Sequence, residues 1–236
     1  MNNTYAMPQS HAVPVAQIGA EARGRFIAKT YAHVFGAIVA FVALEAFFFV
    51  SGLANVILGA LTAVPWLLVL GAFMVTGWLA TRMAESIASP AAQYAGLALM
   101  VLSYAVIFVL PLAIASQFQG MIQSAAIVTL VVFSGLTWYV FMTRKDFSWM
   151  GSMLALMGIG AIALIAAGAL FGFELGIFFS VGMVIFAGAA ILYDTSNVLH
   201  HYPEDRYVAA SLQLFASVAL LFWYILQLFM SFGGDD

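Results

Sequence analysis

Residues 175–202, "LGIFFSVGMVIFAGAAILYDTSNVLHHY", decide the fold class of this chain. No charged residue occurs from Leu175 to Tyr193, and the run then reaches Asp194. An α-helix needs about 20 consecutive apolar residues to cross the hydrocarbon core of a bilayer. The stretch therefore predicts a transmembrane helix, and the acid near its end has to be explained by the rest of the sequence.

The composition of the whole chain agrees with a membrane location. Of its 236 residues, 65% are hydrophobic and 7% are charged, whereas a soluble domain carries about 25% charged residues. The chain is therefore an integral membrane protein, with the lipid bilayer as its first partner. It has no Cys, which excludes disulfides, thiolate metal sites and a cysteine nucleophile. Its net charge of −3 and its lack of a basic run exclude nucleic acid as a partner.

Polar and turn-forming breaks divide the chain into seven apolar segments, each long enough to cross a membrane. A membrane barrel would instead show strands of about ten residues with alternating polarity. The predicted fold class is an all-α membrane protein, a seven-transmembrane-helix bundle in one domain at 23–236. Residues 1–22 lack the apolar core of a signal peptide, so we expect a retained, disordered cytoplasmic tail there. The expected helices lie near 26–51, 55–81, 91–115, 121–143, 149–172, 175–199 and 207–232.

The basic residues predict the orientation of the bundle. All seven Lys and Arg fall in or beside the loops on one side, whereas the opposite loops, near 52–54, 116–120 and 173–174, contain none. Lys and Arg are enriched in cytoplasmic loops. We therefore expect the amino terminus in the cytoplasm and, after an odd number of spans, the carboxyl terminus outside. The residues concerned are Arg23, Arg25, Lys29, Arg82, Arg144, Lys145 and Arg206.

Asp194 is expected about one and a half to two helical turns inside the cytoplasmic boundary, a depth of roughly 10 Å. A charge at the centre of a transmembrane helix costs about 2.5 to 3.5 kcal/mol, so this side chain should face the bundle interior. Asn197 and His201 follow it on the same helix face. The three residues predict a polar stripe leading from the interior to the cytoplasm. The alternative interpretation is an interhelical ion pair or hydrogen bond that only fixes packing.

Candidate partners for Asp194 lie on other segments. Arg82 ends the second segment on the same side of the membrane and is a candidate counter-charge. The seventh segment offers Gln213 and Ser217 on one helix face. Glu45 lies late in the first segment, near the opposite boundary. We interpret Glu45 as a carboxylate that reaches the outer headgroups; the alternative is an acid at the outer mouth of an ion pathway.

Four stretches together resemble the Bax inhibitor-1 family, in its bacterial branch. The most specific is "ILYDTSNVLHHY" at 191–202, followed by "RYVAASLQLFASVALLFWYILQLF" at 206–229. The link "TRKDFSWMGSML" at 143–154 and the basic start "RFIAKTYAHVFGAIVA" at 25–40 are also similar to that family. The resemblance covers roughly residues 20 to 232 and all seven expected spans.

This resemblance implies a bundle whose last helix is central, and a pH-sensitive calcium leak gated by two aspartates that share a proton. Asp194 matches the first aspartate, and Arg82 matches a basic residue that can latch to it. Ser217, in "LFAS", stands where the second aspartate is expected. A Ser hydroxyl does not titrate in this range, so the chain departs from the paired-acid mechanism. One carboxylate with Ser and Asn oxygens would be a weak Ca²⁺ site, which suits permeation.

We therefore expect a pH-responsive calcium leak channel in the bacterial inner membrane, with no cofactor other than the permeant ion. The alternative is a non-transporting protein that binds and modulates other membrane proteins, such as a membrane-bound protease. A hydrolase is disfavoured, because the adjacent residues His200 and His201 diverge by about 100° on a helix and neither HExxH nor GxSxG occurs. Asp194, Ser217, Arg82, Asn197, His201 and Gln213 are the expected pathway residues.

Overall fold

A computed structural model describes residues 13–86 and 89–233 of the chain, and its described part is helical, without β-strands. Seven of the helices are long and apolar enough to cross a membrane, as the sequence predicts. The helices are η1 (Val15–Gln17), α1 (Ala20–Ser51), α2 (Leu53–Thr62), α3 (Trp66–Ala84), α4 (Pro90–Ala115), α5 (Met121–Thr143), α6 (Met150–Phe171), α7 (Gly176–His200), η2 (Glu204–Arg206) and α8 (Tyr207–Gly233).

The second expected span, 55–81, is wrong as one helix. The structure divides it into the short α2 and the spanning α3, with Pro65 at the N-cap of α3. Proline supplies no backbone N–H and disfavours helical backbone in the residue before it, so the chain breaks there. A ten-residue helix such as α2 is about 15 Å long, half the thickness of a bilayer core. The number of spanning helices is unchanged.

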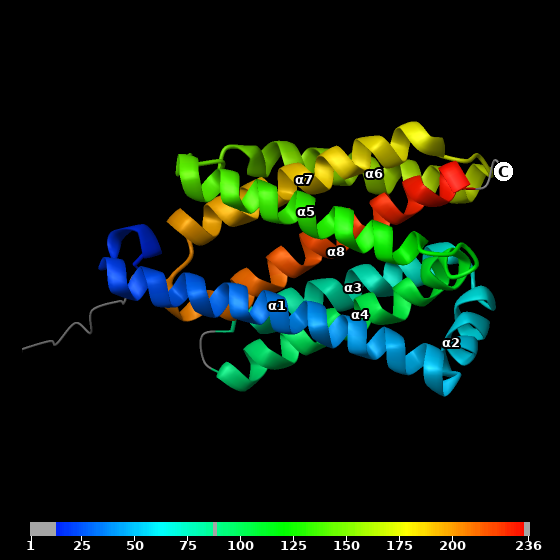
Figure 1. Cartoon of the computed structure of the whole chain (residues 1–236), viewed down its shortest axis with the longest axis horizontal. Helices are drawn as coiled ribbons and strands as arrows, with labels where there is room; N and C mark the ends of the chain where they lie inside the picture. The colour runs from blue at the N-terminus through cyan, green and yellow to red at the C-terminus, as the bar shows by residue number, and fades with distance from the viewer. Residues whose placement is uncertain (1–12, 87–88, 234–236) are drawn as a thin grey trace, which may run out of the picture.

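The last helix lies at the centre of the bundle, as the sequence resemblance implies. Figure 1 shows α8 running obliquely between α6 and α7 on one side and α3 and α4 on the other. It packs against α1, α3, α4, α5 and α7, and buried residues occur along most of its length. These five spanning helices therefore share α8 as a core, whereas α6 packs mainly on α7.

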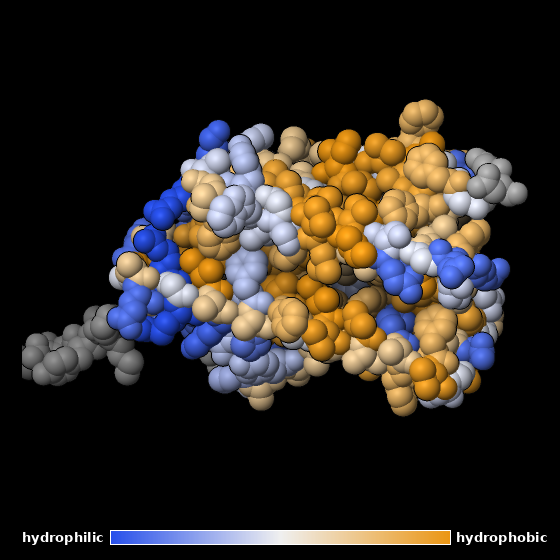
Figure 2. All heavy atoms as spheres, viewed as in Figure 1, coloured by the Kyte–Doolittle hydropathy of each residue, from blue (hydrophilic) through white to orange (hydrophobic). Residues whose placement is uncertain are grey.

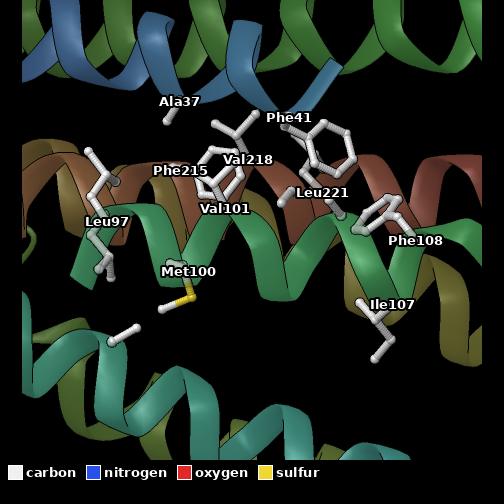
Figure 3. Close-up of a cluster of buried hydrophobic side chains, with 14 of the residues drawn as sticks. Ala37, Phe41, Leu97, Met100, Val101, Ile107, Phe108, Phe215, Val218 and Leu221 are labelled. Carbon is white, nitrogen blue, oxygen red and sulfur yellow. The ribbon is translucent and has the colours of Figure 1, made fainter. Parts of the chain in front are cut away.

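Aromatic and aliphatic side chains fill the middle of this core (Figure 3). The ring centroid of Phe41 lies 5.1 Å from that of Phe108 and 6.3 Å from that of Phe215, which joins α1, α4 and α8. Val218 and Leu221 of α8 are buried in the same cluster. Edge-on aromatic pairs at these distances are favourable, so the bundle interior is closed by packed rings at this level.

The helices α3 and α4 approach one another closely at Gly96. A Cβ atom built at this position would lie 2.5 Å from the carbonyl oxygen of Ala80 and 2.6 Å from the backbone nitrogen of Ala84. Only a residue without a side chain permits two helix backbones to approach this closely.

The surface of the bundle has the polarity expected of a membrane protein. Figure 2 shows a broad hydrophobic region across the middle and hydrophilic residues gathered at the end where α1 begins. Large apolar side chains such as Phe35, Val50 and Phe178 are exposed, because lipid rather than water surrounds them. The seven Lys and Arg residues all lie toward that hydrophilic end, which we call the basic end. Which end faces the cytoplasm stays a prediction.

The segment before α1 is more ordered than the expected tail at 1–22. Residues 1–12 lie outside the described residues, but Val15 is 0% exposed and its N–H donates to the carbonyl oxygen of Tyr202 at 2.8 Å. Val15 packs with Phe26, Val198 and Leu214 from α1, α7 and α8. Burial of one apolar side chain is the physical reason that the order begins earlier than the polar composition predicts.

Candidate functional site

The buried acid of α7 meets a hydroxyl of the central helix. Ser217 Oγ donates a hydrogen bond to Asp194 Oδ2 at 2.5 Å, and the two residues are 8% and 9% exposed. Such a short O–H···O distance is typical of a hydrogen bond to a carboxylate. The structure thus brings together Asp194 and Ser217, which the sequence places on different helices. Their hydrogen bond joins α7 to α8.

No basic side chain of the described residues forms an ion pair with Asp194. Arg82, the expected counter-charge, is exposed on α3. Its guanidinium lies 5.6 Å from the ring centroid of Trp78, one helical turn earlier, in a cation–π contact. The structure therefore does not bring Arg82 to Asp194, and the negative charge of the site has no cationic partner there.

The expected stripe of Asp194, Asn197 and His201 is interrupted at the C-cap of α7, where His201 contacts a loop residue instead. The helix ends at His200, and the backbone N–H of His201 donates to the carbonyl oxygen of Asn197 at 2.8 Å. Beyond the helix the ring of His201 turns outward, and its Nε2 lies 3.0 Å from Asp146 Oδ2 in the α5–α6 loop. His201 and Asp194 are therefore not neighbours in this conformation.

The α5–α6 loop contributes a polar cluster that the sequence reasoning missed. Asp146 Oδ1 accepts the backbone N–H of Ser148 at 2.8 Å, and Ser196 Oγ of α7 accepts that of Phe147 at 2.8 Å. The backbone hydrogen bond from Ser148, with the contact to His201, lowers the pKa of Asp146 to about 2. The "D-x-S" order is a known turn pattern, in which an Asp side chain binds the backbone two residues later. That pattern could have identified the loop.

Three further hydroxyls lie beside the Asp194 site. Tyr31 of α1 has Thr137 of α5 and Thr195 of α7 as neighbours, with the Asp194 carboxylate nearby. All three hydroxyl oxygens are buried, and none has a hydrogen-bond partner among the described residues. Buried hydroxyls of this kind are usually satisfied by an internal water. The sequence offers no signal for them, because a Thr hydroxyl in an apolar helix normally bonds to the backbone of its own helix and a single Tyr does not reveal which neighbours its hydroxyl meets.

Gln213 of α8 is partly buried. Two positions earlier, Ser211 Oγ donates to the carbonyl oxygen of Thr30 at 3.0 Å. Ser211 therefore joins α8 to α1.

The interpretation of Glu45 as a headgroup-facing carboxylate is wrong. Glu45 is 6% exposed, and neither carboxylate oxygen has a hydrogen-bond partner among the described residues. The buried residues Phe41 and Phe48 of α1 lie four positions before it and three after it. This spacing places Glu45 on the core face of the helix. A role at the mouth of a pathway stays a prediction.

Among the described residues, neither His33 nor His200 forms a hydrogen bond with Asp194 or Ser217. The ring of His33 lies 3.3 Å from the Tyr94 hydroxyl, and His200 Nδ1 lies 2.9 Å from the carbonyl oxygen of Ser196. Ser217 is bonded to a carboxylate rather than to an imidazole. Across 13–86 and 89–233 no three His, Cys, Asp or Glu side chains come together in a metal-binding group.

Comparisons with known proteins identify the family. A family model described as "Inhibitor of apoptosis-promoting Bax1" matches residues 23–234. The chain belongs to the Bax inhibitor-1 family. None of the solved structures gives a significant match. The match to the family model confirms the resemblance that the sequence shows, most specifically in the stretch around Asp194.

Curated relatives in bacteria and eukaryotes are similar to parts of the chain. An uncharacterized protein of Pseudomonas aeruginosa is 38% identical over 120 residues, which are 50% of this chain and 53% of the relative. Bax inhibitor 1 of Schizosaccharomyces pombe is 32% identical over 121 residues, 49% of this chain and 44% of the relative. The modulator of FtsH protease YccA of Escherichia coli is 32% identical over 109 residues, 46% and 49% of the two chains. The chain thus spans about half the length of these relatives.

Proposed function

We propose that this family member is a cation leak of the bacterial inner membrane, with calcium as a permeant ion and the Asp194–Ser217 pair as its intramembrane site. The observation that supports the proposal most strongly is a carboxylate buried between α7 and the central α8, with a hydroxyl and, among the described residues, no basic side chain as its partner. A carboxylate inside a membrane protein is costly to keep and typically marks an ion or proton pathway.

The pair can act as a transient cation site. Ser217 donates to Asp194 in the structure, but its hydroxyl can rotate and present a lone pair to an ion bound by the carboxylate. Two protein oxygens leave most of the six to eight ligands of Ca²⁺ to water. The hydroxyls of Tyr31, Thr137 and Thr195, which are buried and unbonded among the described residues, would hold such waters. Binding of this kind is weak, and an ion can leave again.

In the structure, apolar side chains obstruct the proposed pathway on both sides of the pair. Beyond the pair, the rings of Phe41, Phe108 and Phe215 pack across the interior, and on the basic side Val15 is buried against α1, α7 and α8. A cation would need both obstructions to move. Since a constriction of apolar side chains blocks ions by excluding water, opening means separating α1 from α4 and α8 at the Phe41 level.

Calcium flux into proteoliposomes tests the proposal. Asp194→Asn should reduce the flux at least about tenfold, because the only change is the loss of the charge that attracts the cation. Glu204→Gln, an exposed acid in η2, serves as a matched control and should leave the flux unchanged. Thermal denaturation first shows that the wild-type and Asp194→Asn proteins are both folded. Equal flux through the two would then refute the proposed site.

A second candidate function is the modulation of a membrane-bound protease. It is supported by the similarity to the Escherichia coli relative whose name states that role. The binding surface would then be the amino-terminal segment rather than Asp194. Deleting residues 1–12 leaves Val15 and its contacts in place, so this deletion tests binding without opening the basic end. Co-purification with a membrane-bound protease should be lost in the deletion and kept in Asp194→Asn; the reverse result would contradict this function.

A further inference from the structure

A large cleft opens between two groups of helices. Its walls are α3 and α4 on one side and α6 and α7 on the other, with α8 as the floor, and its volume is about 880 Å³. Ligand sites typically enclose roughly 300–1,000 Å³. Because α3 and α6 scarcely touch, nothing in the described chain closes the cleft toward the bilayer. It does not include the Asp194–Ser217 pair.

The cleft is as deep as one leaflet of a bilayer. On α6 its lining runs from Ala169 inward to Gly158, and on α7 from Gly176 to Phe186. The ten to eleven helical steps along each stretch correspond to about 15 Å, which is half of the roughly 30 Å hydrocarbon core. The cleft begins at the end of the bundle opposite the basic end and stops at the middle. An acyl chain that enters from that leaflet would fill its length.

The mouth of the cleft is polar and carries a negative charge. Glu174 lines it, is exposed, and has no hydrogen bond or ion pair with any described residue. Gln227 and Ser231 of α8 line it as well, and Ser180 Oγ lies 3.4 Å from Gln227 Oε1. None of the seven Lys and Arg residues lies at this end. A headgroup with a net negative charge would meet the like charge of Glu174 here, with no Lys or Arg to offset it.

We propose that this cleft binds one phospholipid with a primary-amine headgroup, phosphatidylethanolamine in class. Its acyl chain would lie along α6, α7 and α8, and its ammonium would lie beside Glu174. A primary ammonium has N–H donors for a carboxylate and an amide oxygen, whereas the quaternary ammonium of phosphatidylcholine has none. The bound lipid would also supply the packing that α3 and α6 do not give one another. The inference is independent of the cation leak.

Lipid retention tests the proposal. The full chain is reconstituted with equal amounts of phosphatidylethanolamine, phosphatidylcholine and phosphatidylglycerol of the same acyl chains, and then extracted in mild detergent. Mass spectrometry should find phosphatidylethanolamine retained in about tenfold excess, the ratio that one charge-assisted hydrogen bond provides. Glu174→Gln should remove most of this excess, and Glu174→Lys should transfer it to phosphatidylglycerol. Glu204→Gln, at the basic end, should retain the wild-type preference.

A pair of glycines of α6 tests the position of the lipid. Gly158 lines the cleft, and a Cβ atom there would meet only Phe186 at an ordinary 3.6 Å. Gly158→Leu should therefore fill the inner part of the cleft and reduce retained phosphatidylethanolamine severalfold. A Cβ at Gly160 meets nothing within 4 Å, and this residue does not line the cleft, so Gly160→Leu is the control. Equal retention of all three lipids by the wild type, or unchanged preference in Glu174→Lys, would overturn the proposal even if Gly158→Leu fails to fold.

Discussion

Replacing Ser217 by Ala removes the donor that serves the buried carboxylate of α7. The lost hydrogen bond spans 2.5 Å between side chains that are 8% and 9% exposed, so bulk water does not replace it. Hydrogen bonds to charged groups contribute about 1.5–3 kcal/mol, and a buried acceptor left unpaired adds its own desolvation cost. We expect Ser217→Ala to lower the free energy of unfolding by about 2–3 kcal/mol.

The assay is reversible unfolding of the purified protein in mixed micelles, followed by circular dichroism. Ser231→Ala is the matched control, because that hydroxyl lies on the same helix, is exposed and bonds only to the carbonyl of Gln227; it should change stability by less than about 0.5 kcal/mol. A double-mutant cycle with Asp194→Asn should show a coupling energy above about 0.5 kcal/mol. If the two serine variants are equally stable, or the cycle is additive, the pair does not link α7 to α8 as described.

Four other predictions concern topology, pH and packing. Reporters fused at the two termini should be active on opposite sides of the membrane, with the amino-terminal one in the cytoplasm; activity on one side would contradict the seven spans. Wild-type flux should vary weakly between about pH 6 and 8, and Ser217→Asp should make it steep, since two close acids split their titrations; Asp194→Asn should flatten both profiles. Because the pKa of Asp146 is lowered to about 2, its stabilising contribution is complete above about pH 4 and is lost as the pH falls toward 2; thermal denaturation of Asp146→Asn should lack that acid-dependent step. Gly96→Ala should cost about 1–3 kcal/mol in unfolding titrations because its Cβ would lie 2.5 Å from an α3 carbonyl, whereas Gly77→Ala, with nothing within 4 Å, should be neutral or stabilising.

The sequence predicts the spans well because the bilayer imposes a length on every apolar run. Six of the seven expected segments match single helices closely. The exception arose at Pro65, where an apolar run continues through a helix break. Hydrophobicity indicates that a segment lies in lipid, but it does not indicate whether one straight helix continues through that segment. In this chain Pro65 is the residue in the sequence that indicates the helix break.

Helix rotation is the property that the sequence predicts poorly. In a soluble helix the polar face identifies the buried one, but lipid and bundle core are both apolar, so the faces of a membrane helix look alike. Asp194 could be assigned to the interior because its charge forbids lipid. Glu45 obeys the same rule: it faces the core, although its position near the end of the first segment predicts that it reaches the outer headgroups.

The contacts of the loops were the least predictable part of the candidate site. His201 lies at the C-cap of α7, and its ring is directed by a loop residue rather than toward Asp194. Its partner Asp146 is 55 positions away in the sequence. Arg82 was paired with Asp194 because opposite charges were expected on one side of the membrane, yet an exposed guanidinium beside Trp78 needs no ion pair to be stable in the headgroup region.

The central position of α8 has a consequence for biosynthesis. This helix follows the other seven α-helices in the chain yet supplies the surface on which most of them pack. A chain emerging from the ribosome therefore inserts its earlier helices before their common core exists. During that interval Asp194 crosses into lipid without Ser217, at a cost of about 2.5–3.5 kcal/mol that the apolar run before it has to outweigh. Nascent chains that stop short of α8 would be loose assemblies of helices, exposed to the quality-control proteases of the membrane.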